Sequence, residues 1–445
     1  MNIAKQSVII RNVRLPGDST PHLIVLKDGR VESLDQSSNG QTEYSADSIE
    51  INAAGMTALP GMIDLYARLR EPGLTRKGTI ARESQAALAA GFTCVLCAPD
   101  TQPAIDSVAT VELVQHRAEV ANGARVIPMA ALTVGLQGEQ LSELATLQAA
   151  GCPVAGQADH PLESTTVLHS AMEYAASFNM PLFMTARDAQ LGASGCAHAG
   201  AMATRLGLPG IPVAAETVAL ARLLELCSET GCRLHISRIS SARAVQMVAA
   251  AKQQALPVSC DVGLHHLFFT DEHLSGYDSS FHSAVPFRSH ADRDALRQGL
   301  VDGVIDAICS DHAPHDHDAS LAPFPATEPG LAAYRWAIPL ILQLPDMLDL
   351  PLQQVISKLS DAPRRIINGS TEAGLQPGAA ADFFLLTEDH SIEQDIRAST
   401  LAGHNHPLNI HDARDLRLQP LRGRVTHVFS NGQMHVPGEK PAHND

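Results

Sequence analysis

The chain has 445 residues, of which 45% are hydrophobic and 18% are charged, a balance typical of globular proteins. Its formal net charge of -16 argues against a nucleic-acid partner, and no apolar run reaches the roughly 18 residues of a membrane-spanning helix. At this length a large α/β barrel with a smaller appended domain is favoured.

The first 55 residues alternate short β-rich runs with turn signals. Strand-like runs cover residues 8–10, 23–25 and 31–34, and Asp28-Gly29 between apolar runs predicts a β-hairpin. The first run begins within a few residues of the N-terminus, without the longer apolar stretch and cleavage site of a secretory signal. We therefore expect a cytoplasmic protein in which residues 1–55 form part of a β domain.

The middle of the chain, residues 56–375, interleaves strand-like with helix-like runs. A helix is expected over residues 241–253, with Ser241 as N-cap, Val245, Val248 and Ala249 on one face, and Pro257 beyond its end. Eight strands alternating with helices predict a (β/α)8 TIM-type barrel of the α/β class. The strand-like runs are residues 61–65, 93–98, 126–129, 153–156, 181–185, 233–237, 258–262 and 304–309.

The alternation of β-rich runs and turn signals recurs near the C-terminus. Residues 382–386 and 425–429 are strand-like, and Ser430-Asn431-Gly432 is a turn signal. We expect residues 376–436 to complete a small β-sandwich domain with the N-terminal segment. The polar residues 437–445 are predicted to form a disordered tail.

The eight cysteines are scattered through mostly apolar segments, which predicts reduced, buried thiols rather than a disulfide framework. Cys94 and Cys97 form a C-x-x-C pair. Without a second pair, and within a run typical of a buried strand, they favour a structural role over a zinc site.

Motifs at the ends of the predicted strands carry a family resemblance. Pro60-Gly61-Met62-Ile63-Asp64 is followed by Leu69-Arg70-Glu71-Pro72-Gly73. This arrangement resembles the strand-one motif of dihydroorotase, a barrel-fold amidohydrolase, in which P-G-x-I-D leads into H-x-H-L-R-E-P-G. The resemblance covers essentially the whole chain in the same order. Further matching segments are residues 98–101, 210–216, 265–267, 292–296, 310–315 and 377–382.

The resemblance implies a zinc site, but four histidines that would bind the metal are replaced. The H-x-H motif reads Tyr66-Ala67-Arg68, and the next two ligand positions hold Thr185 and Arg238. A protonated phenol is a poor ligand, and a guanidinium has no lone pair to give. We expect that the family zinc is lost and that the chain has no cofactor.

Two carboxylates remain at matching positions. Asp311 stands where the family has its catalytic aspartate, and Asp159 matches one acid of the family's D-D-G segment. A buried charge without a partner is strongly disfavoured. We therefore predict that Arg68 or Arg238 pairs with Asp311 or Asp159 and that both acids are vestigial.

The residues that would anchor the substrate are only partly retained. Arg70 and His315 are present, but the family asparagine of M-P-N is Asp100, which would repel an anionic substrate. Ala284 replaces a second family asparagine. We expect Arg70, Asp100 and His315 to be a vestigial substrate site.

The resemblance is to the inactive dihydroorotase homologues that assemble with the catalytic chain of bacterial aspartate carbamoyltransferase. It implies a non-catalytic subunit of pyrimidine biosynthesis required for assembly of that enzyme. Two other functions stay open. One is an active cyclic amidohydrolase with an atypical site built on Asp311, His312, His315 and His235. The other is an anion-binding regulatory protein that uses Arg68, Arg70 and Arg238.

The remaining histidines are given structural interpretations. His312, His315 and His317, with Asp316 and Asp318, could form a new metal site, but a loop without fixed ligand spacing is favoured. His265 and His266 are expected to pack or hydrogen-bond around the strand before them. His404 and His406 are expected to be exposed loop residues.

Overall fold

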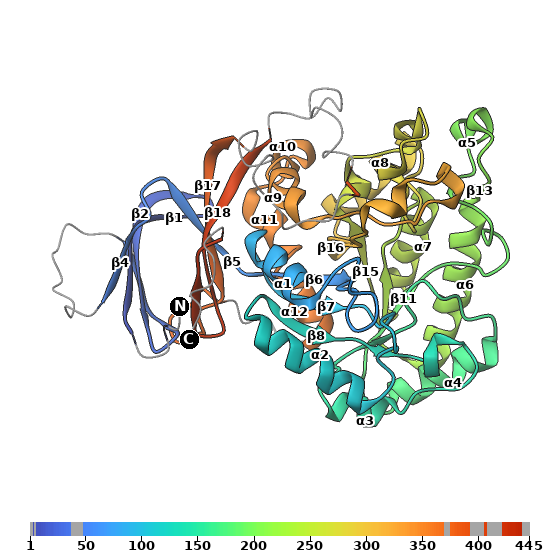
Figure 1. Ribbon diagram of the computed structural model, residues 1–445, viewed down its shortest axis with the longest axis horizontal. Coiled ribbons are helices and arrows are strands. Elements are labelled where there is room, and N and C mark those ends of the chain that lie inside the picture. The colour runs from blue at the N-terminus through green and yellow to red at the C-terminus, as the bar shows by residue number, and fades with distance from the viewer. Residues whose placement is uncertain are drawn as a thin grey trace.

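The computed structural model describes residues 3, 6–36, 48–368, 374–391, 405–406 and 421–437. These residues form a β-sandwich and a helix-covered barrel that lie side by side (Figure 1). The predicted combination of a TIM-type barrel with a β domain built from both chain ends is confirmed. No helix in the described ranges is long and apolar enough to cross a membrane.

The β domain joins strands from both ends of the chain. The strand order is β19-β18-β17-β5-β1-β2-β3, and β4 pairs in parallel with β1. Apolar side chains of the two layers, including Ile10, Leu26, Phe383 and Phe429, form a core of their own. The hairpin at Asp28-Gly29 is confirmed, with Lys27 opposite Arg30. The strands are β1 (Val8–Leu15), β2 (Asp18–Lys27), β3 (Arg30–Gln36), β4 (Ile49–Asn52), β5 (Met56–Pro60), β17 (Phe383–Ser391), β18 (Arg422–Ser430) and β19 (Gln433–His435).

The barrel strands lie in parallel, and each predicted strand-like run overlaps one of them. Hydrogen bonds between neighbours run from β9 through β10, β11, β14 and β15 to β16, and a second set joins β6, β7 and β8. The Arg68 backbone N–H donates to the His312 carbonyl at 2.8 Å, which ties the first strand end to the last. The strands are β6 (Met62–Ala67), β7 (Phe92–Cys97), β8 (Arg125–Pro128), β9 (Ala130–Ala131), β10 (Ala155–Gly156), β11 (Leu182–Thr185), β14 (Leu234–Ser237), β15 (Val258–Gly263) and β16 (Ala307–Cys309).

The last barrel strand is shorter than predicted. Residues 304–306 precede it, because the backbone N–H of Ile305 bonds to the Gly299 carbonyl and closes the helix before it. A short parallel pair, β12 (Ala197–His198) and β13 (Gly210–Ile211), lies outside the barrel sheet.

Helices surround the barrel, and α9, α10 and α11 lie on the side that faces the β domain (Figure 1). The helix predicted over residues 241–253 is confirmed as α7. Ser241 is its N-cap, and the Ser241 side chain accepts a hydrogen bond from the Ala244 backbone N–H. The helices are α1 (Ile80–Ala89), α2 (Val108–Ala121), α3 (Leu144–Ala149), α4 (Thr165–Ala176), α5 (Ala201–Leu206), α6 (Val213–Thr230), α7 (Ala242–Gln253), α8 (His290–Val301), α9 (Tyr334–Ile341), α10 (Leu344–Leu348), α11 (Leu352–Ser357) and α12 (Asp361–Asn368).

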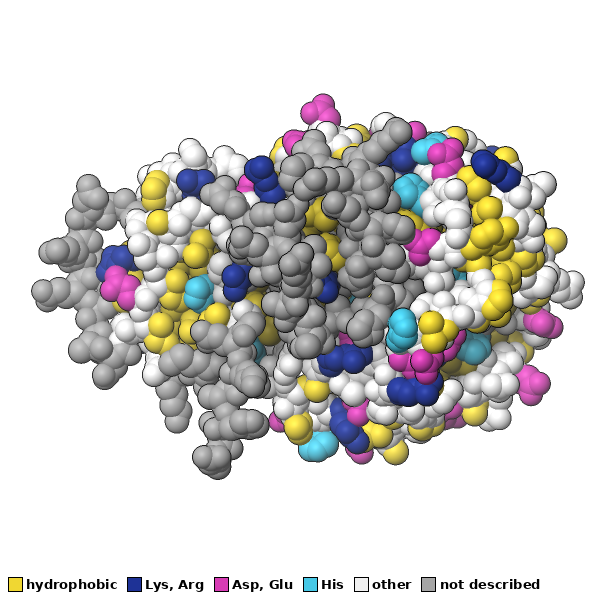
Figure 2. Space-filling view, turned by 45° about the horizontal axis from the view of Figure 1, so that its top comes forward, with side chains coloured by type: hydrophobic (Ala, Val, Ile, Leu, Met, Phe, Trp, Pro, Cys, Tyr) yellow, Lys and Arg dark blue, Asp and Glu magenta, His cyan; other side chains and the backbone are white. Residues whose placement is uncertain are grey.

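Charged side chains of both signs are interspersed on the surface. On the face shown in Figure 2, the coloured Lys and Arg side chains lie scattered among Asp, Glu and His, without a continuous basic stripe over the described residues. Binding to a phosphate backbone relies on clustered cations. The described residues of this face show no such cluster. The predicted tail, residues 437–445, lies outside the described residues except for Pro437.

Candidate functional site at the barrel mouth

Seven of the residues singled out in the sequence meet at one mouth of the barrel, because parallel strands in a closed barrel end on the same face. The backbone turns sharply there, and Arg70, Ala158, Arg238 and Asp311 have positive φ angles of 65°, 50°, 59° and 50°. Such angles cost non-glycine residues about 1–3 kcal/mol each. The converging side chains are Tyr66 on β6, Arg68 just beyond it, Asp100 after β7, Asp159 after β10, Thr185 on β11, Arg238 after β14 and Asp311 after β16.

Arg238 is the central cation of this cluster, and its side chain is fully buried. Its guanidinium donates to Asp311 Oδ1 at 2.8 Å and to Thr185 Oγ1 at 2.6 Å, and it also pairs with Asp159. One guanidinium thus links three strand ends. The predicted pairing of a replacement arginine with Asp311 or Asp159 is confirmed.

Arg68 is the second cation. Its Nε donates to Asp100 Oδ2 at 2.7 Å, and its Nη2 pairs with the second carboxylate oxygen of Asp159. Asp159 therefore bridges the two guanidinium groups, of Arg68 and Arg238, with one oxygen on each. The result is a continuous chain of ion pairs from Asp100 to Asp311.

Tyr66 contacts the guanidinium groups of both arginines. The Arg238 guanidinium carbon lies 3.8 Å from the centre of the Tyr66 ring, a cation–π contact, and Arg68 Nη2 donates to the phenol oxygen at 3.1 Å. Burial raises the pKa of Tyr66 above its ordinary value, although both arginines oppose the shift. The phenol therefore stays protonated.

The charges within this cluster are nearly balanced. Two guanidinium groups face three carboxylates, and the Asp100, Asp159 and Asp311 side chains are 18%, 19% and 9% exposed. Burial alone would raise the pKa of Asp159, but Arg238 and Arg68 outweigh it and hold the pKa well below its ordinary value. In the same way, burial lowers the pKa of each arginine, but the carboxylates raise it well above normal. Asp159, Arg68 and Arg238 are therefore charged at neutral pH.

A buried aspartate, Asp261, fixes the backbone of Arg238. Asp261 on β15 accepts the Arg238 backbone N–H at 2.6 Å, and its other oxygen lies 2.9 Å from His235 Nε2. The opposite nitrogen of the His235 ring contacts Ser259 Oγ at 2.9 Å. His235 therefore belongs to the interior of the barrel and not to the mouth cluster.

The residues expected to form a vestigial substrate site, Arg70, Asp100 and His315, are split between two networks. Arg70 Nη2 lies 3.1 Å from His315 Nε2, and Arg70 Nε donates to the Pro314 carbonyl at 3.0 Å. Burial, reinforced by the charge of Arg70, lowers the pKa of His315 to about 4. Asp100 does not project as a lone repulsive charge, since Arg68 neutralises it.

The other histidines have structural partners. His312 Nε2 contacts Glu83 Oε2 at 2.9 Å, and its Nδ1 accepts the Ala333 backbone N–H at 3.0 Å. The expectation of an exposed His406 is wrong, since His406 is buried, lies 2.8 Å from His265 Nε2 and stacks on Trp336. His404 lies outside the described residues.

These residues do not suit a metal ion. The positions that match the family's ligands present a phenol, two guanidinium groups and a hydroxyl, and the hydroxyl already accepts from Arg238. In the part of the chain that the structure describes, no group of three or more His, Cys, Asp or Glu residues could hold a metal. Cys94 and Cys97 lie buried on β7, and burial raises the pKa of Cys97 to about 12, against a thiolate ligand.

Sequence reasoning missed three features of the site. Asp100 is a partner of Arg68, Tyr66 is a platform for Arg238, and Asp261 fixes the Arg238 backbone. The pairing of Asp100 with Arg68 could have been predicted, because an acidic and a basic residue follow neighbouring strands. The contact of Arg238 with the Tyr66 ring and the hydrogen bond from its backbone to Asp261 leave no recognisable pattern in the sequence.

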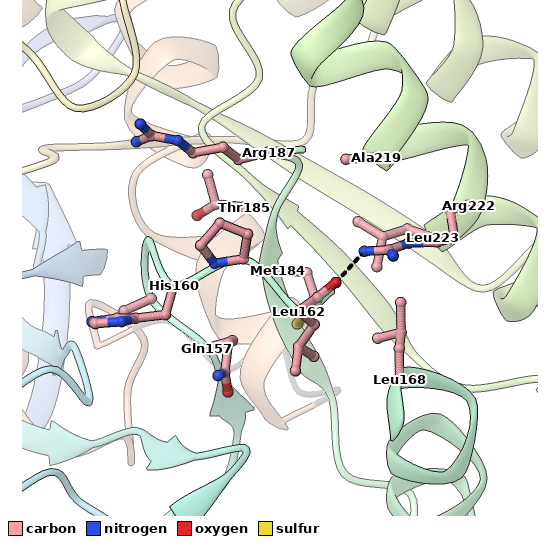
Figure 3. A pocket seen from close by; sticks show the side chains of 12 residues that line it. Gln157, His160, Leu162, Leu168, Met184, Thr185, Arg187, Ala219, Arg222 and Leu223 are labelled. Carbon is pink, nitrogen blue, oxygen red and sulfur yellow. Dashed lines mark hydrogen bonds between the residues drawn. The ribbon is translucent and has the colours of Figure 1, made fainter. Parts of the chain in front are cut away.

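A small pocket adjoins the cluster and shares Thr185 with it (Figure 3). It lies between the loop after β10, the end of β11 and helix α6. Leu162, Met184 and Leu223 supply apolar wall, and His160, Arg187 and Arg222 are its ionisable residues. The space inside it that a water molecule can reach is only about 10 Å³, and the pocket is partly open to solvent.

Comparisons with known proteins agree with the motifs. Residues 55–244 match the family model described as Dihydro-orotase-like. A Dihydroorotase-like protein of Pseudomonas putida is 43% identical over 85% of this chain and 86% of the relative. The Dihydroorotase of Anaeromyxobacter dehalogenans (strain 2CP-C) is 36% identical over 94% of each chain. Among solved structures, an L-hydantoinase from Arthrobacter aurescens aligns with a TM-score of 0.79, at 21% identity, over 98% of this chain and 97% of its own.

Proposed function

The chain belongs to the dihydroorotase-like family, and from that premise we propose that it is a non-catalytic member, a structural subunit of pyrimidine biosynthesis in the cytoplasm. Its partner is the catalytic chain of aspartate carbamoyltransferase, which needs it for assembly. The single observation that carries the non-catalytic part is the Arg238 guanidinium, paired with Asp159 and Asp311 at the barrel mouth.

Hydrolysis of a cyclic amide needs an electrophile that polarises the carbonyl and a base that activates water. The acid that would be the base, Asp311, instead accepts a charge-assisted hydrogen bond from Arg238. The ion pairs of Arg68 and Arg238 occupy the strand ends where an electrophile would act. A carboxylate fixed in such pairs is a support for the barrel and not a proton acceptor.

The geometry favours this proposal over an atypical hydrolase. Of the four residues that such a site would use, Asp311 contacts Arg238, His312 contacts Glu83, His315 contacts Arg70, and His235 contacts Asp261. They therefore belong to four separate contacts. An anion site on Arg68, Arg70 and Arg238 is also disfavoured. Three aspartates already neutralise Arg68 and Arg238, and Arg70 contacts His315 and the Pro314 carbonyl.

The assembly role rests on the family resemblance. Two relatives named Dihydroorotase-like protein, from Pseudomonas putida and Pseudomonas aeruginosa, are 43% and 44% identical to this chain. Six relatives named Dihydroorotase are less similar, at 33–37% identity. A stable barrel without catalytic groups can still present surface to a partner.

The experiment measures metal content and dihydroorotase activity of the full purified chain, and then co-purification with the aspartate carbamoyltransferase catalytic chain from the same organism. We expect no stoichiometric metal, no turnover and one stable complex. An active dihydroorotase relative, carried through the same preparation, controls for loss of metal during purification. Zinc together with turnover would overturn the non-catalytic role, and failure to form the complex would overturn the partner.

A further inference from the structure

A second cavity lies at the opposite end of the barrel from the ion-pair cluster. Residues that directly precede the neighbouring strands β11, β14, β15 and β16 form one side of it, and three residues of helix α12 form the other. The cavity has a volume of about 420 Å³ and is partly open to solvent. Small-molecule sites in proteins measure about 300–1,000 Å³, so this cavity is large enough for an organic ligand.

Ser259, half-buried at the wall of the cavity, presents a hydrogen-bond acceptor to it. The Asp261 carboxylate can only accept hydrogen bonds, so His235 Nε2, which lies 2.9 Å from it, carries the hydrogen. In the neutral ring the opposite nitrogen, Nδ1, then accepts from the Ser259 hydroxyl at 2.9 Å. Because the hydroxyl hydrogen is used in this way, the lone pairs of Ser259 Oγ remain for a donor that enters the cavity.

Two arginines bring positive charge to the same cavity. Arg365, exposed on α12, forms no ion pair or hydrogen bond with another described residue, and Asp361, one helical turn before it, lies beyond ion-pair distance. Arg233 donates from its terminal nitrogens to the backbone carbonyls of Asn179, at 3.4 Å, and Ile366, at 2.9 Å. These contacts hold the Arg233 guanidinium at the wall but leave its charge without an ion-pair partner among the described residues.

The acid that lines the cavity, Asp306, is already neutralised. Both of its carboxylate oxygens lie 2.7 Å from Lys252 Nζ, and one of them also accepts the Cys260 backbone N–H at 2.9 Å. Lys358 is a further cation nearby. Burial lowers its pKa, and Lys252 and Arg365 add to the shift although Asp306 opposes it. Cations therefore outnumber acids around the cavity, and the local potential is positive in a chain whose net charge is -16.

The rest of the wall is apolar. Leu234 and Val258 are buried at the start of their strands, and Ile366 on α12 is half-buried. A cavity that combines cations, one hydrogen-bond acceptor and apolar wall suits a ligand with an anionic group, an apolar body and a hydrogen-bond donor.

We propose that this cavity binds a small organic molecule that carries an oxyanion and a hydroxyl on an apolar body. The oxyanion pairs with Arg365 and Arg233, the apolar body contacts the Leu234 and Ile366 side chains, and the hydroxyl donates to Ser259 Oγ. The site lies away from the barrel mouth, involves no reaction, and does not depend on the proposed assembly role.

The test is ligand-observed NMR titration of the full chain with 4-hydroxybenzoate and two matched probes. 4-Hydroxybenzamide lacks the charge, and 4-methoxybenzoate lacks the hydroxyl donor. We expect saturable binding of 4-hydroxybenzoate, weaker binding of 4-methoxybenzoate by about threefold to tenfold, and no binding of the amide. 4-Hydroxyphenyl phosphate is titrated in parallel, and the probe that binds more tightly identifies the oxyanion as a carboxylate or a phosphate.

Two variants assign the ends of the ligand. Arg365→Gln removes no described hydrogen bond and should weaken 4-hydroxybenzoate binding by about fivefold or more. Ser259→Ala should abolish the preference for the hydroxyl over the methoxy probe. Arg205→Gln, at an exposed position on α5 that does not line the cavity, is the control and should bind as the parent does.

Three results would overturn the proposal. They are absence of saturable 4-hydroxybenzoate binding, equal binding of the amide, and unchanged binding in Arg365→Gln. A preference for the hydroxyl probe that survives in Ser259→Ala would overturn the assignment of Ser259 as its acceptor. The comparison of probes on the parent chain needs no substitution, so it decides the ligand class even where Ser259→Ala disturbs the His235 contact.

Discussion

Replacing Arg238 by methionine tests whether guanidinium groups hold the barrel mouth together. Methionine keeps the apolar stem and removes the contacts to Asp311, Asp159 and Thr185. Asp159 retains Arg68, but Asp311, 9% exposed, loses its ion-pair partner. Removing one partner of a buried pair costs about 3–5 kcal/mol. We expect Arg238→Met to lower the free energy of unfolding by about that amount, measured by urea denaturation, since a guanidinium salt would screen the same charges.

Two further variants decide whether the loss is electrostatic. Arg238→Met combined with Asp311→Asn removes the stranded charge and should recover at least about 1–2 kcal/mol of the loss. Arg243→Met, at an exposed α7 position, should change stability by no more than about 0.5 kcal/mol. The reasoning fails if Arg238→Met lies within about 1 kcal/mol of the parent, or if the double variant is no more stable than the single one.

Three further predictions follow from the same contacts. Incubation with EDTA should leave the Tm unchanged, since guanidinium groups and not a metal join the strand ends; a fall of several degrees would contradict this. Burial, aided by His266 and His312, holds the pKa of His265 at about 3 in the folded state. Unfolding lets this residue take up a proton below about pH 6.5, so stability should fall as the pH drops from 6.5 towards 3, with about 2 kcal/mol lost at pH 5 from His265 alone. His265→Gln should flatten that slope in urea titrations. Asn405→Ala removes amide donations to the Ala313 and Gly330 carbonyls, both at 2.9 Å, and should destabilise the chain by about 2–3 kcal/mol, whereas exposed Gln137→Ala should not.

The fold could be read from the sequence because its signals are local and repeated. Each barrel strand is a short apolar run, and the helix caps and the Asp28-Gly29 turn follow from the conformations that those residues prefer. The error at residues 304–306 arose where apolar residues close the preceding helix instead of pairing in the sheet. Hydrophobicity alone does not distinguish a residue that packs beyond a helix end from one that pairs in a sheet.

The site could be predicted in part. The rule against lone buried charges predicted ion pairs for Arg68 and Arg238, and the structure contains them. His406 was misread because a polar, proline-containing segment is typical of an exposed loop. Its burial depends on Trp336 and His265, which are distant in the chain. Contacts of this kind have no local signature.

The replacements at the mouth are best understood as one compensated change. Introducing Arg238 alone beside Asp159 and Asp311 would leave an acid in excess, and introducing Arg68 supplies the second cation. Asp100 then gives Arg68 a partner for its Nε, so that each of the two guanidinium groups and three carboxylates has an ion-pair partner. Removing Arg238 would leave Asp311 without an ion-pair partner among the described residues, and removing Arg68 would do the same to Asp100. This mutual dependence gives Asp159 and Asp311 a structural role: paired with the arginines, the two acids support the barrel mouth, and their loss would destabilise it.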